Sequence, residues 1–117
     1  MLDIALAYRR AGNQDKFNDA MARVRAAHNS LTKQGLSNNL FFAGEASYYT
    51  MADHRQQALK FLAAAVDGGA IFATHITDLW PYFEELKGDP EYEAIQARMI
   101  EHLNRERNKL GLKPIST

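Results

Sequence analysis

The residues of this chain that could do chemistry are four histidines and several paired acids. The histidines are His28, His54, His75 and His102, and no two of them stand four residues apart. A zinc site on one helix needs two histidines at that spacing with a carboxylate nearby, as in His-Glu-x-x-His. The sequence therefore predicts no metal site, and we expect His54 to be a surface residue at a turn.

Acidic residues come in two pairs, Glu84-Glu85 and Glu91 with Glu93. Two carboxylates can act as general acid and base only inside a pocket, and no pattern here predicts one. Both pairs lie at or near predicted helix starts, where negative charge is favourable in any case. The chain also lacks a glycine-rich phosphate loop, a Gly-x-Ser-x-Gly elbow and cysteine. We therefore predict no catalytic residue and no cofactor.

Basic residues are densest near the N-terminus, at Arg9, Arg10, Arg23 and Arg25. Arg9 and Arg10 could contact an acidic peptide or a phosphate, or form a solvated face that nearby aspartates neutralise. Over all 117 residues, 14 basic and 14 acidic residues cancel, so nucleic-acid binding is not expected. No apolar run approaches the roughly 20 residues that span a bilayer.

The N-terminal segment MLDIALAYRR has no basic leader before an apolar stretch, so we expect it not to be a signal peptide. The absence of cysteine fits a reducing compartment such as the cytoplasm. A periplasmic location stays open if the chain belongs to a membrane-anchored regulator.

Apolar residues at helical spacing predict the elements that would position these side chains. Gly12 would end the first helix, and Asp15 would cap the second. Gly88-Asp89-Pro90 gives a stop, a cap and a first-turn proline, the clearest helix start in the chain. No segment alternates with period two, so the predicted fold class is all-α. We predict one domain over residues 1–117, with helix pairs over 2–31 and 38–68 and two capping helices over 78–110.

One pattern occurs twice in the chain, about 41 residues apart. In each copy, a helix carries a small residue shortly before a tyrosine (Tyr8 or Tyr49) and ends at a turn residue (Gly12 or Asp53). A second amphipathic helix follows each turn. Helix pairs that repeat in this way are typical of proteins that bind other proteins.

The two pairs resemble tetratricopeptide repeats over roughly residues 2–27 and 39–67. Glu45 stands where the family usually has an apolar residue, Phe17 stands where it has a small one, and the family's usual spacing is 34 residues. The resemblance implies a right-handed superhelix of two helix pairs, in which alanines let neighbouring helices approach closely. The residues that match the repeat's packing positions are Phe42, Ala46, Tyr49, Ala58, Leu62 and Ala65.

This resemblance also implies a groove that binds a protein or peptide partner, lined by the first helix of each pair. The lysines and asparagines with which the family clamps C-terminal carboxylates are lacking at these positions. The alternative is that the small residues only let helices pack. The lining residues would be Leu2, Leu6, Arg9, Arg10, Ala43, Ser47, Thr50 and Met51.

Apolar residues lie on more than one face of the first predicted helix. Leu2 and Leu6 point away from the face that carries Ile4 and Tyr8. We expect further repeats or a second copy of the chain to cover Leu2 and Leu6. The sequence therefore predicts a possible homodimer through this helix.

Residues 80–92 resemble the closing segment of repeat-rich regions in some bacterial signalling proteins. Its aromatic residues would either dock a partner, through Trp80 and Tyr82, or pack on the fourth helix as a cap that leaves Tyr82 exposed. In the capping interpretation, Trp80 and Phe83 fold onto the fourth helix and Tyr92.

The resemblances imply a non-catalytic scaffold for protein–protein interaction. It would be the C-terminal interaction or sensory region of a bacterial signalling or transcriptional regulatory protein. The alternatives are a homo-oligomerisation module that uses the N-terminal helix, and a small enzyme with a carboxylate-lined pocket.

Overall fold

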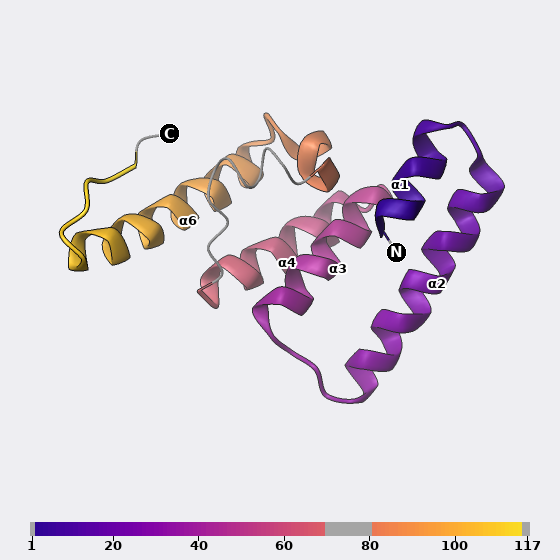
Figure 1. The fold of residues 1–117 in the computed structure, drawn as a ribbon, viewed down its shortest axis with the longest axis horizontal. Coiled ribbons are helices and arrows are strands. Elements are labelled where there is room, and N and C mark those ends of the chain that lie inside the picture. The colour runs from indigo at the N-terminus through magenta and orange to yellow at the C-terminus, as the bar shows by residue number, and fades with distance from the viewer. Residues whose placement is uncertain (1, 70–80, 116–117) are drawn as a thin grey trace.

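The computed structural model describes residues 2–69 and 81–115, and within these ranges it contains helices and no strand. This confirms the all-α fold class. Figure 1 shows α1 and α2 at one end of the molecule, α3 and α4 in the middle, and α6 at the other end. The elements are α1 (Leu2–Arg10), α2 (Gln14–Lys33), α3 (Asn39–Met51), α4 (Arg55–Asp67), the 3-10 helix η1 (Pro81–Leu86) and α6 (Pro90–Lys109).

The repeated pattern produces the same turn in both copies. After α1, the Asn13 N–H donates to the Tyr8 carbonyl at 2.9 Å, and Gly12 has a φ of 74°. After α3, the His54 N–H donates to the Tyr49 carbonyl at 2.8 Å, and Asp53 has a φ of 63°. Both are Schellman caps, in which a residue in the left-handed region ends the helix. In each helix pair, an equivalent turn therefore joins the first helix to the second.

The helix starts follow the sequence with one correction. Asn13, not Asp15, caps α2, because its side-chain oxygen accepts from the Lys16 N–H at 3.2 Å. Asp15 lies inside the first turn instead. Asp89 caps α6 by accepting from the Glu91 N–H at 2.9 Å, with Pro90 in the first turn as predicted.

The larger core joins α3, α4, η1 and α6. Small residues let α3 and α4 pack closely, because Ala46, Ala58 and Ala65 are each 0% exposed. Tyr49 and Phe61 stack beside them, with ring centroids 5.6 Å apart. The remaining residues of this core are Leu59, Leu62, Val66, Phe83, Leu86, Tyr92, Ile95 and Met99.

The C-terminal helices therefore cap the second pair, as the capping interpretation predicts for Phe83 and Tyr92, and Leu86 joins them in the same core. Trp80, the remaining member of the predicted aromatic patch, lies outside the described residues.

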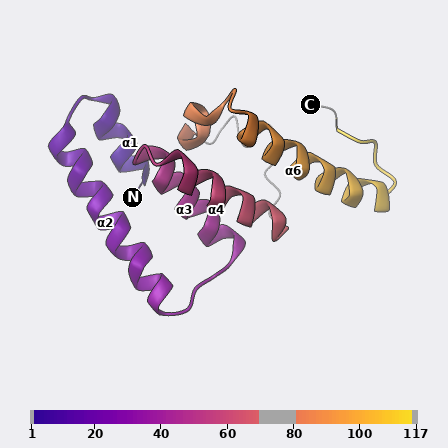
Figure 2. The same cartoon turned by 180° about the vertical axis from the view of Figure 1, so that it is seen from behind.

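A smaller core holds α1 and α2 to the rest of the molecule. Its buried members are Ala5, Ala20, Met21 and Met51, the last of which comes from α3. Figures 1 and 2 show from opposite sides that α2 diverges from α3 toward the loop that joins them. Hydrophobic packing connects α2 to α3 through Ala20, Met21 and Met51, and the contact farther along α2 has a different chemistry.

Candidate functional site

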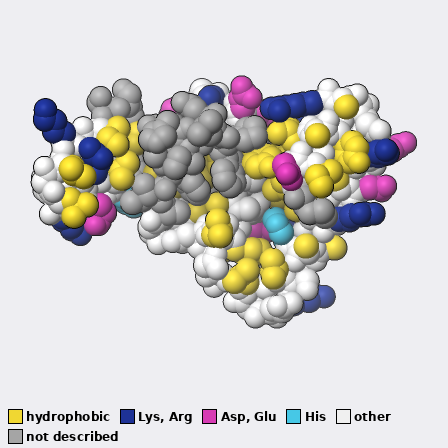
Figure 3. Space-filling view, in the orientation of Figure 1, with side chains coloured by type: hydrophobic (Ala, Val, Ile, Leu, Met, Phe, Trp, Pro, Cys, Tyr) yellow, Lys and Arg dark blue, Asp and Glu magenta, His cyan; other side chains and the backbone are white. Residues whose placement is uncertain are grey.

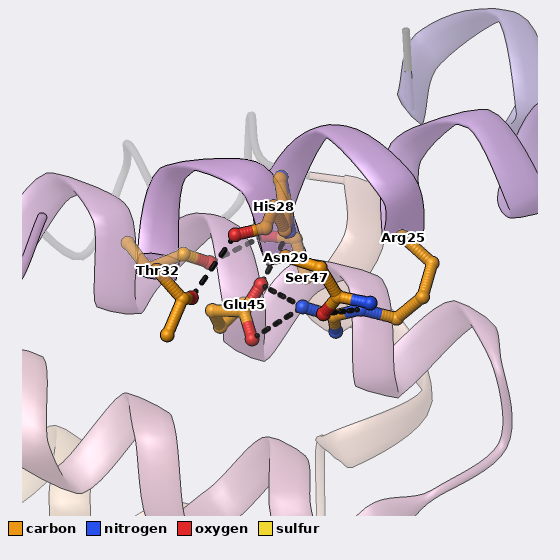
Figure 4. A network of polar contacts seen from close by, with 7 residues as sticks. Arg25, His28, Asn29, Thr32, Glu45 and Ser47 are labelled. Carbon is orange, nitrogen blue, oxygen red and sulfur yellow. Dashed lines mark hydrogen bonds and ion pairs between the residues drawn. The ribbon is translucent and has the colours of Figure 1, made fainter. Parts of the chain in front are cut away.

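A buried polar cluster joins α2 to α3. Glu45 of α3 is 3% exposed, and both of its carboxylate oxygens accept from Arg25 Nη2 at 3.0 Å. His28 Nδ1 also contacts Glu45 Oε1. Figure 4 shows Arg25 and His28 reaching from α2 to the carboxylate. These three residues, Arg25, His28 and Glu45, are called the Glu45 cluster below.

Aromatic rings enclose the cluster. The Arg25 guanidinium lies 4.8 Å from the ring centre of Tyr48 and 5.4 Å from that of Tyr49. Arg25 Nη1 is buried without a hydrogen-bond partner among the described residues, so the ring faces are its nearest favourable surroundings. Burial raises the pKa of the Tyr48 hydroxyl. The Phe41 ring meets the His28 ring edge-on, with centroids 5.7 Å apart.

This geometry suits a structural link better than catalysis. A general base needs a carboxylate oxygen that a substrate can reach, and the oxygens of Glu45 are buried and already hold Arg25 and His28. Sequence reasoning treated Arg25 and His28 separately, and Glu45 only as a departure from the repeat. Glu45 is the one charged residue between Asn39 and Met51, and that signal could have indicated a buried ion pair.

The paired acids named in the sequence analysis do not gather around one pocket in the described part of the chain. Glu85 Oε1 pairs with Arg9 Nη2 at 2.6 Å, and Glu93 Oε1 accepts from the Gly88 N–H at 3.1 Å. Glu84 and Glu91 are exposed.

Within residues 2–69 and 81–115, no group of three histidines, aspartates or glutamates is placed to hold a metal ion. In the same ranges, no helix combines the length and apolar character that crossing a bilayer requires.

The α3 half of the predicted groove is wrong. Ala43, Ser47, Thr50 and Met51 are all buried, because α3 lies between α1, α2, α4 and η1. The hydroxyls of Ser47 and Thr50 donate to carbonyls of their own helix, at 2.9 and 2.8 Å. A partner cannot reach these residues in this structure. The small side chains let helices pack, which was the alternative interpretation.

The α1 residues of the predicted groove fall into two groups, the leucines and the arginines. Leu2 and Leu6 are half-buried against the smaller core, so the expectation that they need an outside cover is wrong. Both arginines are exposed, and Arg9 forms an ion pair with Glu85. The face of α1 that carries Leu2, Ala5 and Leu6 packs on α2 and α3, and this turns Ile4 outward. Ile4 is 49% exposed.

Tyr82 is not the exposed aromatic residue that the capping interpretation predicts. It is half-buried and packs against both cores. Burial, with a smaller contribution from the nearby Asp3 carboxylate, raises the pKa of its hydroxyl. Tyr82 therefore links the C-terminal cap to α1 and α2, and it does not present a docking surface.

An open hollow of about 370 Å³ lies between α1 and α2. Figure 3 shows hydrophobic side chains over this end of the molecule, with charged side chains of both signs around them. Lys16 Nζ lies 5.6 Å from the centre of the Tyr8 ring. We call this hollow the α1–α2 groove. Its lining residues are Ile4, Tyr8, Lys16, Asp19, Ala20 and Arg23.

Sequence reasoning missed this surface because it placed Ile4 and Tyr8 on the packed face of the first helix. Comparison of the chain with protein-family models, with curated proteins and with solved structures found no match. The α1–α2 groove and the Glu45 cluster are therefore interpreted from their own geometry.

Proposed function

We propose that this chain is a non-catalytic protein-interaction domain that binds a segment of a partner protein in the α1–α2 groove. The observation that carries the proposal is the groove itself, where Ile4 is exposed between helices and has charged side chains around it. Large apolar side chains with a charged border are typical of surfaces that bind proteins. The equivalent turn inside each of the two helix pairs supports a repeat-like stack. We also propose that the stack is a right-handed superhelix.

The resemblance of residues 80–92 to closing segments of repeat-rich regions supports a place in a bacterial signalling or regulatory protein. The enzyme alternative has less support, because the acids that could act on a substrate either hold another residue or stand exposed and apart.

A library of helical peptides displayed on phage tests the interaction proposal. Peptides selected on the wild-type chain should bind the Ile4→Asp variant at least tenfold more weakly, because a charge would enter the apolar floor. Leu110→Asp is the matched control, since Leu110 is 76% exposed and follows α6 at the far end of the molecule. Binding to this control should equal binding to wild type.

Two results would overturn the proposal: no peptide is enriched, or the enriched peptides bind Ile4→Asp as tightly as wild type. Light scattering over a range of concentrations separates the homo-oligomer alternative. A mass that rises with concentration in wild type but not in Ile4→Asp would assign the groove to self-association. Leu6→Asp is unsuitable for this purpose, because Leu6 is half-buried and its replacement would disturb the smaller core.

A further inference from the structure

We infer that the occupant of the α1–α2 groove is an amphipathic helix with acidic residues along its flanks. This inference rests on the proposed function and names the chemistry of its partner.

The shape of the groove suits a helix. On α1, Ile4 and Tyr8 are one turn apart, and on α2 the lining residues recur at helical spacing from Lys16 to Arg23. The groove therefore lies between two side-by-side rows, the arrangement that accepts the ridge of a third helix. Ala20 is the small residue of the α2 row, and its short side chain lets another backbone approach closely.

The charge around the groove is positive. Residues 2–33 carry six basic side chains against three acidic ones, although the whole chain is neutral. Two of the six line the groove: among the described residues, Arg23 has no ion-pair partner, and Lys16 has only the Tyr8 ring. Asp19 is the single acid in the lining. Cations around an apolar floor favour a partner that carries carboxylates, through faster association and correct orientation.

The chain already shows this recognition once, on another side of α1. The short helix η1 presents Tyr82 to the smaller core and Glu85 to Arg9, with 2.6 Å between the paired atoms. An aromatic side chain in the apolar contact and a carboxylate on a flanking arginine together hold η1 to the first helix pair. The α1–α2 groove offers the same combination of apolar floor and flanking cations, with no occupant from the described residues.

Two synthetic helical peptides of 18 residues test the inference. Both carry leucines on one face, and they differ only in having glutamate or lysine on the flanks. Fluorescence anisotropy with the full chain should show the glutamate peptide binding at least tenfold more tightly, and its affinity should fall as salt rises. Ile4→Asp should abolish this binding. Lys16→Glu/Arg23→Glu should weaken it by roughly tenfold or more.

The control is Lys60→Glu/Lys109→Glu, which changes the net charge by the same amount on exposed lysines outside the groove. It should leave the affinity within about twofold of wild type, since rim charges act mainly within a Debye length. Lys16→Gln/Arg23→Gln repeats the test without adding like charge beside Asp19. Circular dichroism confirms that each variant is folded.

The outcomes separate the inference from the proposed function. If the lysine peptide binds as tightly as the glutamate peptide and still depends on Ile4, the acidic partner is wrong and the interaction groove stands. The same holds if neither peptide binds but library peptides do. If no peptide of any kind depends on Ile4, both are wrong. Self-association lost in Ile4→Asp would make a second copy the occupant.

Discussion

Replacing Glu45 with alanine should destabilise the protein strongly through the loss of one buried charge. The substitution leaves the Arg25 guanidinium and the His28 ring without the carboxylate that both contact. Removing one partner of a buried pair typically costs about 3–5 kcal/mol. The Arg25 and His28 side chains are 22% and 17% exposed, so water can partly replace the carboxylate. We therefore expect the lower end of that range, about 3 kcal/mol.

Urea unfolding followed by far-ultraviolet circular dichroism measures this loss as a fall in the free energy of unfolding. Glu106→Ala is the matched control, since Glu106 forms an exposed pair with Lys109 at 3.0 Å. It should change stability by no more than about 0.5 kcal/mol. Glu45→Leu combined with Arg25→Met should cost less than Glu45→Leu alone, because no arginine is then left without its partner. Equal effects of Glu45→Ala and Glu106→Ala would refute the reasoning.

Three further predictions concern single contacts. Asp53→Gly should raise the free energy of unfolding by about 0.5 kcal/mol, because glycine adopts the left-handed φ of 63° without strain; lower stability in urea would contradict this. Gly68→Ala should cost about 1 kcal/mol, since a Cβ would lie 2.1 Å from Asn39 Oδ1 and displace the hydrogen bond to the Gly68 carbonyl. In an Asn39→Ala background that cost should disappear. The hydrogen bond from Arg55 lowers the pKa of Asp89 below its ordinary value of 3.8. The stability that this bond gives the fold is therefore present above pH 3.8 and is lost as the pH falls through the pKa of Asp89 in the folded protein. The stability difference between wild type and Asp89→Ala, measured in urea, should therefore narrow from pH 7 to pH 3, and a constant difference would count against the Asp89–Arg55 contact.

The helix boundaries could be predicted because their signals are local. Gly88-Asp89-Pro90 contains the stop, the cap and the first-turn residue of α6 within three positions, and the structure uses each in that role. The turns at Gly12 and Asp53 are equally local, since both depend on one residue in the left-handed region. Even the misplaced cap of α2 was wrong by only two residues.

The α1–α2 groove could not be predicted in the same way, because it depends on which face of α1 packs. Apolar residues surround most of this helix, so two faces are compatible with burial. The face with Leu2, Ala5 and Leu6 packs because Ala20, Met21 and Met51 meet it. That contact brings residues from three helices together, and Ile4 is left outside. No pattern within residues 2–10 contains this information.

The two polar features of α2 have separate roles because they lie on different faces of the helix. Arg25 and His28 point to α3, whereas Lys16 and Arg23 border the groove with α1. At 100° per residue these two sets are roughly opposite each other. The Glu45 cluster can therefore fix the position of α2 against α3 without using the cations of the groove. The ionic link to α3 on one face thus leaves Lys16 and Arg23 on the other face, where they line the groove.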